Sequence, residues 1–439
     1  MPELKTQCVA DLQAARILFV EDGNHGERRP RQHEFVSDGT AFIRAADMAD
    51  GTVNFDTAEK INSVALKRVR KGFGRPGDIL FSHKGTVGKL ALVPLDAPLF
   101  VCSPQTTFWR SLDSKRLDQR YLYYYMASPD FIEQWMARKG ETDMADYVSL
   151  TAQRALSVAL PEIDTQRHIS SILGALDDKI HINLRLNKTL EEAAQALFKS
   201  WFVDFDPVQA KRDGRAPCGM NADIAALFPK HFEDSTLGPI PKGWKWWGLD
   251  DIASFLNGLA LQKYPVGLGS ALPVVKIAQL RTENTRDAEL ASADIPLAYV
   301  IDDGDVIFSW SGSLMVTVWC GGKGALNQHL FKVTSDRYPK WFYRQWTEYH
   351  LEDFQSIAVD KATTMGHIKR HHLADAKVVV PPDELLAAID RVMAPMLDRF
   401  IHNKIENRTL AALRDTLLPN LLLGEIRVRD AERQMESVM

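Results

Sequence analysis

The segment Asp178-Lys-Ile-His-Ile-Asn183-Leu-Arg-Leu-Asn187-Lys-Thr-Leu190 recurs as Asp398-Arg-Phe-Ile-His-Asn403-Lys-Ile-Glu-Asn407-Arg-Thr-Leu410. One Asp, two Asn, one Thr and one Leu coincide without a gap, and Lys/Arg pairs coincide twice. The separation of about 220 residues is far longer than a solenoid repeat. These segments therefore indicate that a whole domain and the helix after it have been duplicated.

The similarity extends upstream of both segments. Gly77-Asp-Ile-Leu-Phe-Ser82 matches Gly304-Asp-Val-Ile-Phe-Ser309. Further matches join Asp22-Gly23 with Asn257-Gly258, Ile43-Arg44 with Val275-Lys276, Gln105 with Gln328, and Ala159-Leu-Pro161 with Val379-Val-Pro381. Each copy has apolar segments bounded by Gly and Pro, then an aromatic helical stretch (Tyr121–Met126, Trp341–Trp346), then a short apolar strand. We expect one mixed α/β globule per copy.

A long helical pattern follows each globule, from Ile169 to Trp201 and from Ile389 to Leu421. Its apolar spacing near 3.5 residues is typical of a coiled coil. Each seam continues for about 35 to 40 residues, or roughly 50–60 Å of helix. Asn183 and Asn403 fall on the seam, where a buried Asn can fix register.

The predicted fold class is mixed α/β (α+β). Two similar globular domains are separated by two long antiparallel coiled-coil helices, and the molecule is pseudo-two-fold by internal duplication.

Composition excludes several classes of protein. The 439 residues are too many for one ordinary core. The sequence has no apolar run near the roughly 20 residues of a membrane span, and its N-terminus has no signal-peptide pattern, so we expect a cytoplasmic protein. The four cysteines lack metal-ligand spacing. Net charge is −4, yet Lys60–Lys89 holds eight basic residues and one acid, Asp78, so this stretch could meet phosphates.

Three segments give the chain a resemblance to a known family. They are Asp22-Gly-Asn-His-Gly-Glu27, Arg75-Pro-Gly-Asp-Ile-Leu80 and Ala196-Leu-Phe-Lys-Ser-Trp-Phe-Val-Asp-Phe-Asp-Pro-Val208, and Leu237-Gly-Pro-Ile-Pro-Lys-Gly-Trp244 adds a fourth match. The sequence resembles the specificity (S) subunit of type I restriction-modification enzymes over nearly its whole length. The resemblance implies two target recognition domains, each reading half of a split duplex DNA sequence. It also implies helices that set the gap and dock two methylation (M) subunits, with restriction (R) subunits in the full complex.

On this layout we expect six regions. They are target recognition domain 1 (1–162), a central long helix (163–205), a connector (206–243), target recognition domain 2 (244–382), a C-terminal long helix (383–426) and a tail (427–439).

Motifs for catalysis are lacking, so we expect a non-catalytic subunit. Asp204-Phe-Asp-Pro-Val208 lacks the second Pro and the aromatic residue of a DNA methyltransferase motif. Gly72–Gly77 fits G-x-G-x-x-G but precedes a strand and contains Pro76, which favours a turn. His367 and His371 have helical zinc spacing without the Glu of H-E-x-x-H, so no metal is expected. No cofactor is expected on this chain; S-adenosylmethionine belongs to the M subunit.

Candidate DNA contacts are polar residues in loops at strand ends and in the basic stretch. Arg or Lys suits guanine, and Asn or Gln suits adenine. The candidates are Arg28, Arg29, Arg31, Lys67, Arg68, Arg70, Lys71, His83, Lys84 and Thr86 in copy one, and Lys263, Trp310, Ser311, Ser313, Lys361, Thr363 and Thr364 in copy two. For any one of them a solvated surface is an equal alternative. Gln105 and Gln328 recur in both copies, so we expect a structural role for them.

Two further interpretations stay open at this point. Trp201 and Phe202, at the end of an amphipathic helix, are candidates for M-subunit docking, with ordinary intrachain packing as the equal alternative. The alternative function is a duplicated protein-interaction scaffold that never touches DNA. Steep loss of DNA binding with salt would separate the two functions. A stand-alone methyltransferase or nuclease has no supporting motif.

Overall fold

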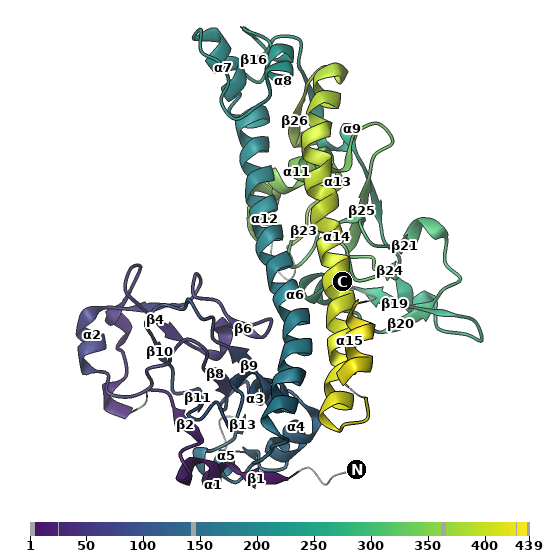
Figure 1. The fold of residues 1–439 in the computed structure, drawn as a ribbon. Helices are drawn as coiled ribbons and strands as arrows, with labels where there is room; N and C mark the ends of the chain where they lie inside the picture. Colours follow the sequence, from purple (N-terminus) through teal and green to yellow (C-terminus); the bar gives the residue numbers. More distant parts are fainter. Residues whose placement is uncertain (1–4, 25, 142–145, 361–365, 427, 437–439) are drawn as a thin grey trace. The chain divides into compact units, whose positions relative to one another are not determined.

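The computed structural model describes residues 5–24, 26–141, 146–360, 366–426 and 428–436. The chain forms two compact units, Met1–Asp178 with Leu410–Met439, and Lys179–Thr409. The long helices α6 (Ile163–Phe198) and α14 (Asp383–Leu422) each contribute to both units (Figure 1). Each unit therefore contains one globular domain together with part of both helices.

The copy-one domain is built on an antiparallel sheet whose central order is β2-β11-β8-β9, extended by β6 and β5. A second sheet has the order β10-β4-β7-β3, with β10 parallel to β4. The strands of the two sheets are β2 (Leu18–Asp22), β3 (Phe35–Val36), β4 (Thr40–Ile43), β5 (Met48–Ala49), β6 (Thr52–Val53), β7 (Lys60–Ile61), β8 (Ile79–Ser82), β9 (Leu90–Leu92), β10 (Phe100–Cys102) and β11 (Thr106–Ser111).

Helices cover this domain, and a small ladder closes it. Strand β1 (Thr6–Cys8) pairs with β14 (Ser157–Ala159), the last strand before α6. The short strands β12 (Gly140–Glu141) and β13 (Asp146–Tyr147) also pair. The helices are α1 (Val9–Ala14), α2 (Ser63–Arg68), α3 (Gln119–Met126), α4 (Pro129–Met136) and α5 (Leu150–Arg154). Asp118 and Ser128 cap α3 and α4 by accepting bonds from backbone N–H groups, as free helix N-termini require.

The copy-two domain repeats this topology. Its main sheet has the order β18-β25-β22-β23, its second sheet the order β20-β19-β24-β21, and β17 pairs with β26 just before α14. The strands are β17 (Lys245–Gly248), β18 (Ser254–Asn257), β19 (Ala271–Val275), β20 (Leu290–Ser292), β21 (Val300–Ile301), β22 (Val306–Ser309), β23 (Met315–Val318), β24 (Gly324–Leu326), β25 (Leu330–Thr334) and β26 (Lys377–Val380). The helices are α9 (Leu249–Ile252), α10 (Ile277–Thr282), α11 (Lys340–Tyr349), α12 (Leu351–Asp360) and α13 (Arg370–Asp375).

The predicted match between Gly77–Ser82 and Gly304–Ser309 is confirmed by strand register. These segments form β8 and β22, whose residues are all buried, as expected for continuous apolar runs at the centre of a sheet. The match of Gln105 with Gln328 is wrong by one residue. Thr106 pairs with Ser82, and Leu330 pairs with Ser309. Gln105 therefore corresponds to His329, and Gln328 corresponds to Pro104.

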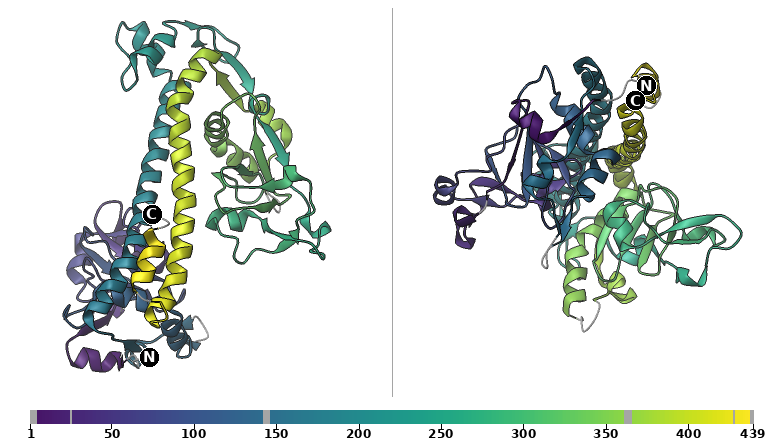
Figure 2. Two further views of the ribbon diagram at one scale, coloured as in Figure 1. Left: turned by 45° about the vertical axis from the view of Figure 1, so that its right-hand side comes forward. Right: turned by 90° about the horizontal axis from the view of Figure 1, so that it is seen from below.

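Helices α6 and α14 pair antiparallel within Lys179–Thr409, where they lie side by side (Figure 1, Figure 2). Asn183 donates to the side-chain oxygen of Asn407 at 2.9 Å, and Asn403 donates to that of Asn187 at 2.8 Å. Asn187 and Asn407 in turn donate to the backbone oxygens of Phe400 and Ile180. Replacing each asparagine by its equivalent in the other copy (Asn183 by Asn403, Asn187 by Asn407) exchanges the two sets of bonds. These four residues, which we call the asparagine quartet, therefore have local two-fold symmetry.

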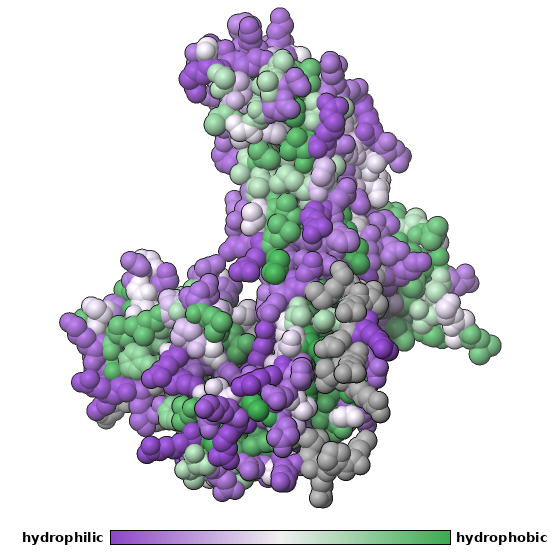
Figure 3. All heavy atoms as spheres, viewed as in Figure 1, coloured by the Kyte–Doolittle hydropathy of each residue, from purple (hydrophilic) through white to green (hydrophobic). Residues whose placement is uncertain are grey.

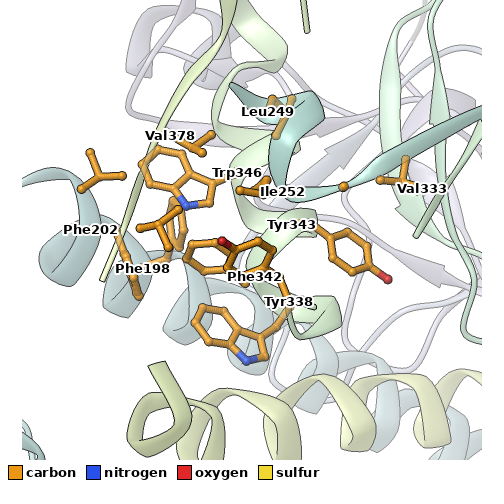
Figure 4. Close-up of a cluster of buried hydrophobic side chains, with 14 of the residues drawn as sticks. Phe198, Phe202, Leu249, Ile252, Val333, Tyr338, Phe342, Tyr343, Trp346 and Val378 are labelled. Carbon is orange, nitrogen blue, oxygen red and sulfur yellow. The ribbon is translucent and has the colours of Figure 1, made fainter. Parts of the chain in front are cut away.

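The largest hydrophobic cluster lies in Lys179–Thr409 and joins α6, α14 and the copy-two domain. Figure 4 shows Phe198 and Phe202 directed toward Phe342 and Trp346 of α11. The ring centroids of Phe198 and Trp346 are 4.9 Å apart, in an edge-to-face arrangement that aromatic pairs favour. Helix α6 continues through a π-helical turn (Lys199–Val203) that delivers Trp201 and Phe202 to this cluster.

The connector expected at 206–243 contains α7 (Asp206–Arg212), α8 (Ala222–Leu227) and a ladder between β15 (Phe232–Glu233) and β16 (Ile240–Pro241). The expected tail contains a further helix, α15 (Val428–Glu436). In the part of the chain that the structure describes, no helix combines the length and apolarity that crossing a bilayer requires. Hydrophilic residues make up most of the face drawn in Figure 3, where hydrophobic ones form separate patches.

Candidate nucleic-acid interface

The loop that follows β8 in copy one contains three predicted DNA contacts, His83, Lys84 and Thr86. His83 lies under the loop, with each ring nitrogen 3.2 Å from a backbone oxygen, of Val148 and of Pro104. Burial lowers the pKa of His83 below its usual value. Because both ring nitrogens face the protein's own carbonyl groups, His83 supports the loop and has no nitrogen left for a base.

Lys84 and Thr86 of the same loop have exposed side chains. Their backbone is fixed on both sides: Lys84 forms a bridge with Tyr147, and the Gly85 N–H donates to Asp146 at 3.0 Å. Gly85 has a φ of 79°, a conformation that glycine adopts without strain. The structure thus presents a cationic and a hydroxyl side chain on a held backbone at a strand end.

The predicted basic contacts of copy one divide into two groups. Arg68 forms two hydrogen bonds with the buried carboxylate of Glu34, and it also donates to the Arg29 backbone oxygen at 3.1 Å. This arginine ties α2 to the loop before β3, so its charge is neutralised within the domain. The remaining predicted residues have exposed side chains; they are Arg28, Arg29, Arg31, Lys67, Arg70 and Lys71.

The corresponding loop of copy two, Trp310–Ser313, uses its side chains differently. The Trp310 indole donates to the Asn257 side chain at 2.9 Å, and its ring packs on Phe331. Ser311 is buried and lies 3.0 Å from Nδ1 of His329. Ser313 accepts a hydrogen bond from Arg281. Each of these three predicted contacts is engaged within the domain.

Lys263 is exposed on the loop after β18. The other three predicted contacts of copy two, Lys361, Thr363 and Thr364, lie outside the described residues.

Strand register places five residues at equivalent neighbouring positions in each copy, which we call the strand-end cluster. Its positions are the end of β2 or β18, the first two residues after β8 or β22, the residue before β11 or β25, and the residue bridged across the loop. They are occupied by Asp22, His83, Lys84, Gln105 and Tyr147 in copy one, and by Asn257, Trp310, Ser311, His329 and His367 in copy two. The backbone is shared and the chemistry differs at every position.

Tyr147 and His329 were not considered in the sequence analysis, and Gln105 was assigned a structural role because Gln328 appeared to repeat it. The signal was present in Asn327-Gln-His329, because Asn327 and Ser103 both accept a bond from the residue two places on. Side-chain capping of that turn would have given the correct register.

A groove of about 700 Å³ opens beside the copy-two cluster. Its polar lining includes Gln262, Lys276, Asn327, Gln328 and His329, and its apolar lining includes Leu261 and Val274. A groove with few polar groups on a mainly apolar wall is typical of a binding site. It adjoins the strand-end cluster of copy two through His329, which lines it.

Trp201 and Phe202 are 3% and 1% exposed, respectively. Phe202 contacts Trp244, Trp341 and Phe342 at ring-centroid distances of 5.6 to 5.9 Å. This packing fits the intrachain alternative for both residues. Asn183 and Asn403 are 1% and 0% exposed and belong to the asparagine quartet, which is the place that a register-fixing role requires.

The described residues contain no group of three or more His, Cys, Asp or Glu side chains that could hold a metal ion. His372 is buried and accepts a hydrogen bond from the Lys369 backbone. Burial raises the pKa of the Cys320 thiol to about 11 and that of the Cys102 thiol further still. Both thiols therefore stay protonated near neutral pH, whereas a nucleophilic cysteine reacts as the thiolate.

Comparison with known proteins gives consistent matches over the chain. The family described as type I restriction modification DNA specificity domain matches residues 25–192 and again 241–414. The specificity subunit of the type I restriction enzyme HindI from Haemophilus influenzae is 23% identical over 433 residues, covering 88% of this chain and 94% of the relative. The MjaIX specificity subunit from Methanocaldococcus jannaschii is 24% identical and covers 79% of each chain.

A crystal structure of a type I restriction-modification S subunit from M. genitalium has the same fold. It aligns with a TM-score of 0.56 at 13% identity and covers 95% of both chains.

Proposed function

This chain belongs to the family of type I restriction-modification DNA specificity subunits, and on that premise we propose that it reads a bipartite duplex DNA target with one half-site per domain. The observation that carries this proposal is the pair of strand-end clusters. They occupy the same place in the same topology, yet they differ at each of their five positions. Two domains with the same backbone and different side chains in their strand-end clusters are expected to bind two half-sites of different base sequence.

The chemistry of the clusters fits base reading in the major groove. Base edges there present a distinct pattern of donors and acceptors, whereas contacts to phosphates only position the protein. The exposed Arg and Lys side chains of copy one supply positioning charge, and the exposed amide of Gln105 can supply direction-dependent hydrogen bonds. A scaffold that never contacts DNA would leave this variation between the clusters unexplained.

As a specificity subunit, the chain is non-catalytic and works in assembly with methylation and restriction subunits. We propose two methylation subunits, one per half-site, each carrying S-adenosylmethionine. The duplicated layout supports this number, because it offers each reader its own length of paired helix. We further propose that the boundaries expected from the sequence, 1–162 and 244–382, delimit the two readers.

Selection of random-sequence duplex DNA by the chain in complex with its methylation subunit tests the proposal. We expect two short motifs separated by a fixed unread gap. Recovery of one uninterrupted motif, or of none, would contradict it. Affinity should also fall steeply with salt, and Lys67→Ala with Lys71→Ala should reduce the salt slope by about two without changing the motif. Lys242→Ala, an exposed lysine in the connector, is the matched control with an unchanged slope.

A further inference from the structure

We propose that the residue just before β11 and β25 is a specificity-determining position, at which Gln105 reads adenine in one half-site and His329 with Gln328 reads a base in the other. This inference rests on the proposed function and deepens it. It assigns a reading position to each domain from the geometry of the strand-end clusters. Neither Gln105 nor His329 was among the contacts predicted from the sequence.

The two residues occupy the same backbone position. Gln105 donates its N–H to the Ser103 side chain, and His329 donates its N–H to the Asn327 side chain. The backbone oxygen of each accepts the N–H of the first residue after β8 or β22, which is His83 or Trp310. The position is therefore clamped from both sides in each copy, and its side chain leaves a rigid base, as a reading residue requires.

Gln105 has an exposed side chain whose amide forms no hydrogen bond with the described residues. A side-chain amide presents one acceptor and two donors, the complement of adenine N6 and N7. Lys84 and Thr86 are exposed on the neighbouring loop, where a phosphate or an adjacent base would lie if Gln105 met a base edge. The structural role expected for Gln105 thus belongs to its backbone alone.

His329 presents a different pattern. Its ring is 6.2 Å from that of Trp310 between centroids, and the Ser311 hydroxyl lies 3.0 Å from Nδ1. The amide nitrogen of Gln328 lies 3.5 Å from Nε2 and can only donate, so Nε2 accepts and the proton of the neutral ring sits on Nδ1, facing the Ser311 oxygen. Both residues line the groove. Copy two thus presents an amide paired with an imidazole where copy one presents an amide alone.

The test compares motifs selected from random DNA by the wild-type complex and by single variants. Gln105→Ala should make one A·T position of one half-site degenerate, with about a 5- to 150-fold loss of preference, and should leave the other half-site intact. His329→Ala or Gln328→Ala should do the same to one position of the other half-site only. Gln7→Ala, an exposed glutamine on β1 of the copy-one domain, is the matched control with an unchanged motif.

Two further readouts separate base reading from a structural effect. The salt slope and the thermal midpoint of Gln105→Ala should equal those of the wild type, because the amide carries no phosphate contact and no fold contact. A uniform loss across all positions, or an intact motif, would overturn the inference. If the wild-type complex itself selects no bipartite motif, the proposed function fails; if it does and Gln105→Ala leaves that motif unchanged, this inference fails alone. Gln328→Ala keeps the test valid in copy two should His329→Ala disturb Ser311.

Discussion

The two copies share a topology but are joined to the helices by different chemistry. In copy one, Arg120 of α3 forms two bonds with Asp178, and the Tyr124 hydroxyl donates to Asp177 at 2.7 Å, where Arg414 also binds. In copy two the same face of α11 carries Trp341, Phe342 and Trp346, which pack against Phe198 and Phe202. The copy-one joint relies on polar bonds, whereas the copy-two joint combines aromatic packing with bonds from Arg344 to Glu191 and from Trp341 to Asp390.

This contrast indicates that the duplication preserved the order of the strands more strictly than the contacts between each domain and the long helices. A polar joint depends on a few directional bonds whose net value is small, whereas an aromatic joint depends on buried area and close packing. The copy-two joint should therefore be the more costly to disturb by truncation of a single side chain.

The largest effect is expected for Phe202→Ala in the aromatic joint. Removing this 1% exposed ring leaves a cavity among Trp244, Trp341 and Phe342 and should lower the free energy of unfolding by about 3–5 kcal/mol. Denaturant unfolding followed by tryptophan fluorescence measures it, because eight of the ten tryptophans lie in Lys179–Thr409. Leu184→Ala, which is 40% exposed on α6, is the control with a small effect. A loss of unfolding free energy for Leu184→Ala as large as that for Phe202→Ala would show that the buried ring contributes no more than an exposed leucine.

A smaller effect is expected for Asp177→Ala in the polar joint. This change leaves the Tyr124 hydroxyl buried without its acceptor, which should lower the free energy of unfolding by about 1–3 kcal/mol. Hydrogen–deuterium exchange of peptides from β8 and β11 reports on this unit directly. The neighbouring Asp178→Ala is the control, because that carboxylate is 58% exposed and its pair with Arg120 should contribute about 0–1 kcal/mol. A loss for Asp178→Ala as large as for Asp177→Ala would show that the hydroxyl is unimportant.

The smallest effect concerns pH and the ion pair between Arg68 and Glu34 in copy one. Hydrogen bonds from Arg68 lower the pKa of Glu34 to about 2. A depressed folded-state pKa means that the carboxylate's contribution is complete above its ordinary value of about 4.5 and is lost as the pH falls toward 2. The thermal midpoint of the wild type should therefore exceed that of Glu34→Gln at about pH 6, and the gap should narrow by about pH 3.5.

The control for this pH series is Glu59→Gln, which removes an exposed pair with Arg44. Such a pair contributes little, so its variant should track the wild type across the series. A gap for Glu34→Gln that stays constant with pH would show that the ion pair adds no linked stability.

Much of the fold follows from the sequence because it rests on repeated patterns. Period and length predict the two helices, and the segments Gly77–Ser82 and Gly304–Ser309 locate equivalent central strands. The seam positions of Asn183 and Asn403 follow from the same period, although their bonds to Asn407 and Asn187 require the antiparallel pairing of α6 with α14. The order of the helices and strands along the chain could be predicted because the duplicated sequence shows it in both copies.

The site was less predictable, because a residue type does not show which partner it meets inside the fold. The sequence suggests that Arg68 is a free cation. In the fold it binds Glu34, which lies more than thirty residues away along the chain. The sequence predicts that Trp310 and Ser311 are loop residues available to a ligand. In the fold their side chains are bonded to Asn257 and His329. Gln105 shows the opposite error, since matching by residue identity gave it the wrong counterpart.

The asparagine quartet has a consequence for how such a chain can change over generations. Each half brings one donor and one acceptor to the crossing, and each receives the same in return. A half whose loops acquire a new DNA preference still presents the same two asparagine side chains to the other helix. The loop residues 83–86 and 310–313 lie outside the quartet, so they can change while the four asparagines stay the same.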